Sequence, residues 1–261
     1  MADGQTGEAD PVLSERRGNV LLITLNRPGV RNAVNAALAE GVAQALDELD
    51  SDAELAAGVL TGAGGYFSAG MDLGAFVKGE SPWYGDRGFA GIAQRASRKP
   101  LIAAIEGFAL AGGLEIALAC DLIVAAKGAR MGIPEAKRSL VAAGGALLRM
   151  PRRMPYHVVM ELALTGDPMP AERFEQFGLV NRVAEPGSAV EVALALAASI
   201  AQNGPLALIA SKQILQEQSD WETAQMWERQ GAISGPVFAS EDAKEGAAAF
   251  KEKREPVWAG R

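Results

Sequence analysis

Hydrophobic and polar positions follow two different periods along the first part of the chain. Short apolar runs rich in β-branched residues predict buried strands at residues 20–25, 58–61, 101–105, 121–126 and 180–183. Between these runs, apolar residues recur at helical spacing and predict helices at residues 35–50, 86–98 and 113–119. Strands that alternate with helices are typical of an α/β domain with largely parallel sheets.

After about Pro186 the pattern becomes helical only, and it predicts helices at residues 190–202, 205–218, 221–233 and 241–253. We therefore expect a flexible acidic leader (1–11), an α/β core that holds the chemistry (12–200) and a helical region (201–261). The leader lacks the basic start and apolar stretch of a signal peptide. No 18-residue apolar run is free of charges and helix breakers, so the sequence predicts no membrane span.

Charge and rare residues exclude several classes of function. The chain has 25 Lys+Arg against 32 Asp+Glu, a net charge of −7, which argues against nucleic acid as the main partner. The single cysteine, Cys120, cannot form an internal disulfide, so we expect a cytoplasmic protein in which this residue packs in the core. The single histidine, His157, cannot form a two-histidine metal site, and we expect it to be structural. Acid–base chemistry would then fall to carboxylates, without a metal.

Two glycine-rich segments are candidates for a site. The first, residues 62–73, follows a strand, but Phe67 replaces the third glycine of a dinucleotide fingerprint and Tyr66 excludes a nucleophile elbow around Ser68. Taken alone, this segment is best interpreted as a tight strand exit. In the second, Gly112 and Gly113 leave backbone N–H groups uncovered where a helix begins, which favours a negative oxygen.

An N–H of Ala69 from the first segment would join that of Gly112 to form a two-donor oxyanion hole. Glu115 lies one turn into the helix, close to whatever such a hole binds. An ordinary acidic residue in a first helical turn explains Glu115 equally well. Glu135 follows Pro134, and by itself it is better interpreted as the start of a helix than as a catalytic acid.

Taken together, these motifs resemble those of the enoyl-CoA hydratase/isomerase (crotonase) superfamily, and the resemblance covers nearly the whole chain. The motifs occur in the family's order: Leu25 to Pro28 with Asn32 and Asn35, Phe67 to Leu73, Gly107 to Glu115, Cys120-Asp121, Pro134-Glu135, Glu241 to Gly246 and Phe250 to Arg254.

The resemblance implies a spiral of ββα units followed by a helical trimerisation region, and a homotrimer or dimer of trimers. It implies that the N–H groups of Ala69 and Gly112 hold the thioester oxygen of an acyl-CoA, and that Glu115 and Glu135 are the two catalytic glutamates. It also implies hydration of enoyl-CoA thioesters in lipid metabolism, with CoA as part of the substrate and no separate cofactor. Positions that match CoA-binding ones are Arg31, Ala33, Ala69, Gly70, Met71, Asp72, Leu73, Phe250 and Lys253; in some members the last two reach CoA from a neighbouring subunit.

Other reactions of the superfamily remain open. Isomerases commonly lack a carboxylate at the position of Glu115, so retention of both glutamates favours hydration or dehydration. Residues 141–146 depart from the Pro-Gly-Ala-Gly-Gly-Thr run of short-chain hydratases, and the region resembles carnitinyl-CoA-dehydratase-like sequences. Trp83 and Tyr84 are candidates for a wall of the acyl pocket. A CoA-thioester-binding protein with little turnover is the alternative from another class.

Overall fold

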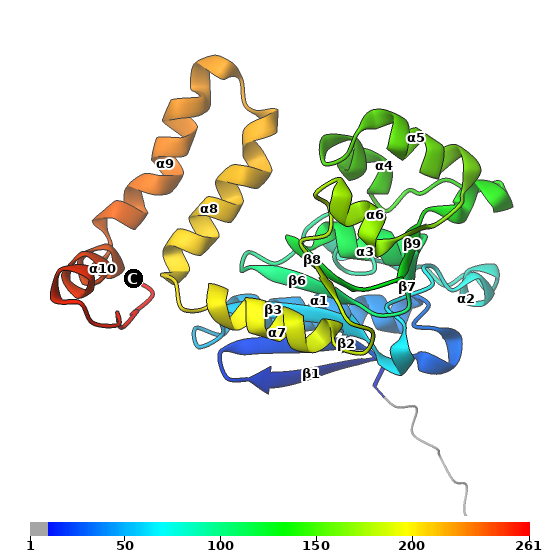
Figure 1. The fold of residues 1–261 in the computed structure, drawn as a ribbon, viewed down its shortest axis with the longest axis horizontal. Coiled ribbons are helices and arrows are strands. Elements are labelled where there is room, and N and C mark those ends of the chain that lie inside the picture. Colours follow the sequence, from blue (N-terminus) through cyan, green and yellow to red (C-terminus); the bar gives the residue numbers. More distant parts are fainter. Residues whose placement is uncertain (1–9) are drawn as a thin grey trace, which may run out of the picture.

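The computed structural model describes residues 10–261, and a six-stranded sheet forms its centre (Figure 1). The sheet has the order β1-β2-β3-β6-β8-β11, in which β1 is antiparallel to β2 and every other neighbouring pair is parallel. Its strands are β1 (Val12–Arg17), β2 (Val20–Leu25), β3 (Ala57–Gly62), β6 (Leu101–Ile105), β8 (Leu122–Ala126) and β11 (Arg182–Ala184). The prediction of an α/β domain is confirmed.

Two smaller sheets lie beside this one. β7 (Phe108–Leu110), β9 (Arg130–Gly132) and β10 (Met169–Pro170) form a three-stranded sheet in the order β10-β9-β7. β4 (Trp83–Tyr84) pairs with β5 (Gly88–Phe89) in a hairpin. None of these short strands was predicted, because each is only two or three residues long, and β1 was not predicted because it is largely exposed.

Helices cover the central sheet and exclude water from it. α1 (Ala36–Ser51) packs on β1 and β2, and α7 (Ala189–Ile200) packs across β2, β3, β6, β8 and β11. The Asn35 side chain caps α1 by accepting a hydrogen bond from the N–H of Leu38 at 3.1 Å. β6 is buried at every position, as expected for a parallel strand covered on both faces.

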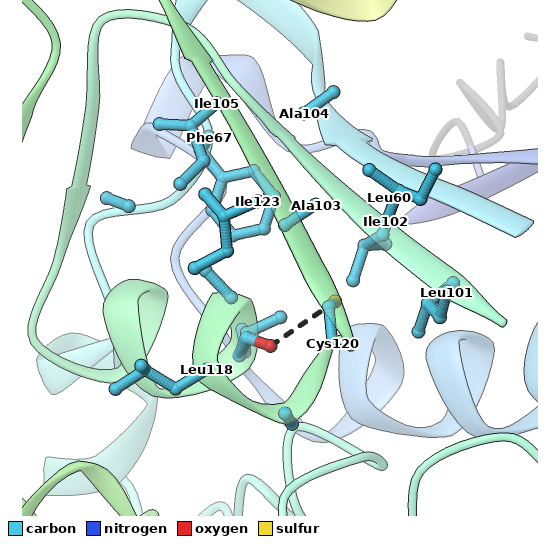
Figure 2. Close-up of a cluster of buried hydrophobic side chains, with 14 of the residues drawn as sticks. Leu60, Phe67, Leu101, Ile102, Ala103, Ala104, Ile105, Leu118, Cys120 and Ile123 are labelled. Carbon is cyan, nitrogen blue, oxygen red and sulfur yellow. Dashed lines mark hydrogen bonds between the residues drawn. The ribbon is translucent and has the colours of Figure 1, made fainter. Parts of the chain in front are cut away.

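The core beneath the candidate site is apolar (Figure 2). Side chains from β3, β6 and β8 meet Leu118 and Phe67 there. Cys120 is buried, and its thiol donates only to the carbonyl of Ile116, at 3.6 Å. The prediction that this cysteine is a core residue is confirmed.

The predicted helix at residues 86–98 is wrong. This segment contains the 3-10 turn η3 (Gly85–Arg87), the strand β5 and irregular chain, because Gly88, Ala90 and Gly91 have φ values of 72°, 55° and 69° that no right-handed helix allows. The Arg87 guanidinium is buried here in an ion pair with Asp47 of α1, which ties the segment to that helix. The predicted helix at 221–233 also begins later, at Met226, after the 3-10 turn η7 (Thr223–Gln225).

Short helices connect the remaining parts of the body. They are η1 (Pro28–Val30), η2 (Ala63–Gly65), α2 (Leu73–Val77), α3 (Gly112–Ala119), η4 (Pro134–Arg138), α4 (Ala146–Arg149), η5 (Met150–Arg152), α5 (Tyr156–Thr165) and α6 (Ala171–Gln176). His157 is exposed in the first turn of α5, beside the ring of Tyr156 and away from the glycine-rich segments.

The last helices form an arm that projects from the body (Figure 1). α8 (Pro205–Glu217) leaves α7 at an angle of 109°, and after η6 (Gln218–Asp220) the chain returns along α9 (Met226–Ala239) to α10 (Glu241–Glu252). The C-terminal segment folds back on this arm, where the indole N–H of Trp258 donates to the carbonyl of Gln202 at 2.8 Å.

Within residues 10–261 no single helix is long and apolar enough to cross a membrane; the bent pair of α7 with α8 and η6 passes that test by length and composition alone. Residues 1–9 of the predicted leader lie outside the described residues. The last two, Asp10 and Pro11, are held by Asn26, which donates to both of their carbonyls.

Candidate active site

The first glycine-rich segment lies between two other pieces of chain. On one side Ser68 accepts a hydrogen bond from the N–H of Leu110 in β7 at 3.0 Å. On the other side the N–H of Val34 donates to the carbonyl of Gly70 at 2.8 Å, and the carbonyl of Val34 accepts from Asp72 at 2.9 Å. The Asn32 side chain holds the same loop by donating to the carbonyls of Ala63, Tyr66 and Phe67.

Gly70 brings this segment against the start of α3. Its φ is 91°, and a Cβ there would lie 2.8 Å from both the Ala111 Cβ and the Gly112 nitrogen. Only glycine adopts this conformation readily and allows this approach. The backbone after Gly70 and the first N–H groups of α3 therefore belong to one site.

The start of α3 has no cap. Ala111, the residue before the helix, has a φ of 53° and offers no side-chain acceptor. In the part of the chain that the structure describes, the N–H groups of Gly112 and Gly113 have no hydrogen-bond partner. Buried helix N-termini normally have such partners, so these donors are available for an anionic oxygen, as the sequence predicts for Gly112.

The second predicted donor has to be corrected. The Ala69 N–H donates to the carbonyl of Arg31 at 3.0 Å, so it is already used inside the protein. Two residues later, the Met71 N–H has no hydrogen-bond partner among residues 10–261. The free donor next to Gly112 is therefore that of Met71. Sequence reasoning could not choose between them, because the choice depends on which N–H the Arg31 carbonyl takes.

Glu115 projects from the first turn of α3 into the interior and is 3% exposed. Its Oε1 accepts a hydrogen bond from the N–H of Ala146, at 3.2 Å, in the turn that starts α4. Burial raises the pKa of Glu115, while backbone N–H groups of Ala146 and Gly144 and the positive charge of Arg149 act against that rise. The protein thus buries this carboxyl and still surrounds it with groups that stabilise its anion.

Glu135 lies in η4, and its surroundings differ from those of Glu115. Its Oε2 is buried and has no hydrogen-bond partner in the described residues. Burial raises its pKa to about 7, its own backbone N–H opposes that rise, and the negative charge of Glu115 adds to it. The two residues are 20 apart in sequence, yet Glu115 lies near enough for its charge to act on Glu135.

Phe89 forms a wall of this site that the sequence analysis missed. A Cβ at Gly112 would lie 2.6 Å from the Phe89 Cε1, and one at Gly144 would lie 3.1 Å from its Cδ1. The ring is therefore packed between the donor glycine and the turn that holds Glu115. Trp83, which was predicted as a wall, lies edge-on to this ring at 5.3 Å between centroids. A lone aromatic residue in an irregular segment gives no signal in the sequence.

The predicted CoA-binding residues fall into two groups. Arg31, Ala33 and residues 69–73 come together on the two neighbouring loops described above. Arg31 is exposed at a φ of 56°, and Leu73 is exposed at the start of α2.

The side chain of Asp72 has a structural partner. It accepts from the N–H of Ala75 at 3.1 Å and pairs with Arg27 at 2.9 Å. Burial alone would raise the pKa of Asp72, but these two donors outweigh it and hold that pKa below its ordinary value.

The second group lies elsewhere in the molecule. Phe250 is 88% exposed on α10, and Lys253 follows the same helix. In Figure 1 the chain returns along α9, so that α10 lies beside the base of the arm, on the opposite side of the molecule from α2. One chain alone does not bring these two residues to the loops. Among the described residues no group of three or more His, Cys, Asp or Glu side chains is placed to hold a metal ion.

Comparison with known proteins agrees with this geometry. The chain is 42% identical to the enoyl-CoA hydratase EchA19 of Mycobacterium tuberculosis, over 98% of this chain and 99% of that protein. It is 41% identical to a carnitinyl-CoA dehydratase of Salmonella heidelberg, over 94% of this chain and 97% of that protein. The crystal structure of an enoyl-CoA hydratase from Mycobacterium tuberculosis superposes with a TM-score of 0.95 at 55% identity, covering 97% of this chain and 100% of that one.

The family model described as enoyl-CoA hydratase/isomerase matches residues 15–261, which include both glutamates, the glycine-rich loops and the arm. The crotonase-like fold expected from the sequence is confirmed by the superposition. With a family match over nearly its whole length and relatives that align from end to end, the chain belongs to the enoyl-CoA hydratase/isomerase family.

Proposed function

We propose that this protein is an enoyl-CoA hydratase, which adds water reversibly across the 2,3 double bond of an enoyl-CoA thioester. The observation that carries the proposal is the pair of carboxyls at one site, Glu115 held by backbone N–H groups and Glu135 with a buried oxygen that has no partner. The two relatives named above as a hydratase and a dehydratase support this class of reaction.

The oxyanion hole in this proposal consists of the N–H groups of Met71 and Gly112. When water adds at Cβ, negative charge develops on the thioester oxygen as an enolate. Two donors that are already in place stabilise this charge without reorganisation, and one such donor is typically worth about 10²–10³ in rate. The positive end of the α3 dipole acts in the same direction.

The two glutamates divide the proton transfers. Glu115, whose anion is stabilised by the turn at residues 144–146, orients a water and removes its proton as the oxygen bonds to Cβ. Glu135, whose pKa is raised to about 7, is protonated in part of the molecules at neutral pH and gives its proton to Cα. The product therefore carries the OH of the water at Cβ and the proton of Glu135 at Cα, and the cycle closes when Glu115 loses its proton to solvent and Glu135 takes one up from it. Each proton transfer contributes about 10²–10⁴ in rate.

CoA would lie along Arg31, Ala33 and residues 69–73, with backbone groups as the main contacts because the Asp72 carboxylate is already paired. We assign Phe250 and Lys253 to the CoA of a neighbouring subunit in a homotrimer or a dimer of trimers, since one chain keeps α10 on the opposite side of the molecule from α2. Every step uses backbone donors and two carboxyls, so the proposal includes no separate cofactor. The single buried thiol of Cys120 supports a reducing, cytoplasmic compartment.

A carnitinyl-CoA-type dehydratase is the second candidate. It is favoured by the Salmonella relative and by residues 141–146, which differ from the run of short-chain hydratases. This turn contacts Phe89 as well as Glu115, so a change there bears on which acyl group fits beside the carboxylate.

The test is the loss of the conjugated enoyl-thioester absorbance when the protein is mixed with crotonyl-CoA, and then with longer enoyl-CoAs. We expect Glu115→Gln and Glu135→Gln each to lower kcat by at least about 10²-fold while CoA-ester binding stays within several-fold. Glu161→Gln, an exposed glutamate of α5, is the matched control and should retain full activity.

Full activity in both glutamine variants would contradict the carboxylate mechanism. Tight binding with no absorbance change at any chain length would instead show a CoA-thioester-binding protein. Carnitinyl-CoA as the one thioester that reacts would select the second candidate.

A further inference from the structure

The turn that holds Glu115 is itself held by a cation. Arg149, the last residue of α4, places its guanidinium behind this turn, where Nη1 donates to the carbonyl of Gly144 at 3.4 Å. Gly145 has a φ of 110°, and a Cβ there would overlap the Arg149 Nη1. The chain therefore keeps a glycine at the position where the guanidinium lies against the backbone.

The other face of the same turn meets the carboxylate. The Ala146 N–H donates to Glu115, and a Cβ at Gly144 would lie 2.6 Å from the Glu115 Oε2. No hydrogen bond joins Arg149 to Glu115 in the described structure. Arg149 thus acts on the carboxylate through the backbone of the turn and through its charge.

The guanidinium makes a second connection on the opposite side. Its Nη2 donates to the carbonyl of Ala93, in the irregular segment that follows β5. β5 carries Phe89, whose ring packs between Gly112 and Gly144. One side chain therefore joins the two pieces of chain that enclose Glu115.

We propose that Arg149 is the positioning residue of Glu115: it fixes the Gly144–Ala146 turn and the Phe89 segment around the carboxylate, and it places a positive charge behind that turn. The catalytic part of this proposal rests on the proposed function. The placement of Arg149 rests only on the contacts described above.

Several other charged groups face these two side chains. The negative charges of Glu135 in η4 and of Glu115 act on each other. The positive charge of Arg153 and the thiol of Cys120 at the end of α3 act on Arg149. An arginine stays protonated in such surroundings. Arg153 donates to the carbonyl of Leu118 at 2.8 Å and has no hydrogen bond to the turn among the described residues, so it provides a neighbouring cation as the control.

The experiment compares Arg149→Gln, Arg149→Lys and the control Arg153→Gln in the full-length protein. For crotonyl-CoA hydration we expect Arg149→Gln to move the acid limb of the kcat/KM pH profile upward by about one unit, because an opposite charge nearby lowers a carboxyl pKa by about 1–3 units. Arg149→Lys keeps the positive charge, so the acid limb of the pH profile should stay at its wild-type position. It loses one of the two carbonyl contacts, so kcat should fall several-fold. Arg153→Gln should leave the limb in place.

A carboxyl ¹³C NMR titration of Glu115, assigned with Glu115→Gln, gives a readout that needs no turnover. A raised Glu115 pKa in Arg149→Gln supports the inference even if crotonyl-CoA does not react. The titration therefore tests the role of Arg149 independently of the proposed hydratase activity. An unmoved Glu115 titration in Arg149→Gln overturns the inference. If that variant does not fold, Arg149→Lys decides: a lowered kcat with an unchanged acid limb supports the role, and wild-type kcat overturns it.

Discussion

At the scale of single residues, Glu135 keeps a carboxyl oxygen buried without a hydrogen bond. Leaving a buried acceptor unpaired typically costs about 1–3 kcal/mol of stability. Glu115, by contrast, has its N–H partner from Ala146. Burial raises the pKa of both carboxyls, but backbone N–H groups oppose that rise at Glu115, whereas the pKa of Glu135 is raised to about 7.

The raised pKa of Glu135 predicts a dependence of stability on pH. The folded protein holds this proton more tightly than the unfolded chain does, so the stabilisation is complete below the ordinary value of 4.5 and is lost as the pH rises through about 7. Glutamine carries no charge at any pH. We expect Glu135→Gln to exceed the wild type by about 1–2 kcal/mol at pH 8, after allowance for partial exposure, and to equal it near pH 4.5.

Urea unfolding at the two pH values measures this difference, and the exposed Glu161→Gln serves as the control. An equal free energy of unfolding for wild type and Glu135→Gln at pH 8 would show that ionised Glu135 is well solvated.

The glycine pair at a helix start indicated Gly112, whereas Glu115 and Glu135 became candidates through the family resemblance, because each alone has an ordinary explanation at a helix start. Their catalytic roles stay predictions. Sequence reasoning chose Ala69 where the structure offers Met71, since every residue has an N–H and only the hydrogen bond to Arg31 decides which one is free. Arg149 was missed for a similar reason: its partners are carbonyls of Gly144 and Ala93, which carry no signature in the sequence.

At the scale of elements, the site depends on how closely the 67–72 segment approaches the start of α3. Gly70 allows this approach in two ways: it adopts a positive φ, and it has no Cβ to clash with its neighbours. Comparing its substitution with that of another glycine separates the two effects. In Gly70→Ala the new Cβ is at a residue with positive φ and also clashes with Ala111 and Gly112. In Gly65→Ala the φ is likewise positive, at 79°, but the new Cβ has no neighbour within 4 Å.

We expect both alanine variants to lose about 1 kcal/mol of stability from backbone strain. Gly70→Ala should in addition lower kcat by about 10²-fold, because it displaces the Met71 and Gly112 donors from one another. Gly65→Ala should keep kcat within a few-fold. Steady-state kinetics with thermal unfolding of both variants provides the measurement, and equal kcat in the two would argue against a hole formed by these donors.

The prediction of elements succeeded where apolar runs are long and buried, as in β2, β3, β6 and β8. It failed at residues 86–98, where Phe89, Ile92 and Ala93 do recur at helical spacing but the backbone at Gly88 and Gly91 turns the other way. Those apolar residues pack in the core all the same. The spacing of apolar residues at 86–98 therefore predicted correctly that these side chains are buried, but wrongly that the backbone is helical.

At the scale of the whole molecule, the arm leaves large apolar side chains in water. Trp227 and Phe238 are each 81% exposed on α9 and lie 11 residues apart, which is about three helical turns and places them on one face. A face of this kind on a projecting arm is typical of a subunit interface. It supports the trimer or dimer of trimers implied by the family resemblance.

Light scattering tests this assembly. We expect a mass of about three or six times the 27.2 kDa chain, and a shift to the monomer when Trp227→Ser and Phe238→Ser are combined. Leu13→Ser, which removes an exposed apolar side chain from β1 outside the arm, should leave the mass unchanged. A monomeric wild type would contradict both the interface and the assignment of Phe250 and Lys253 to a neighbouring subunit.

Phe250 and Lys253 lie at the end of α10, on the opposite side of the molecule from α2, so their proposed role in a neighbour's CoA site would link affinity to mass action. If a neighbour completes the CoA site, only assembled protein binds substrate fully, and dilution below the assembly constant weakens binding while the glutamates remain intact. Substrate would in turn hold subunits together, because a ligand that contacts two chains stabilises their contact by the same free energy. In such an assembly the arm would make the concentration of the protein itself a determinant of how tightly each site holds its thioester.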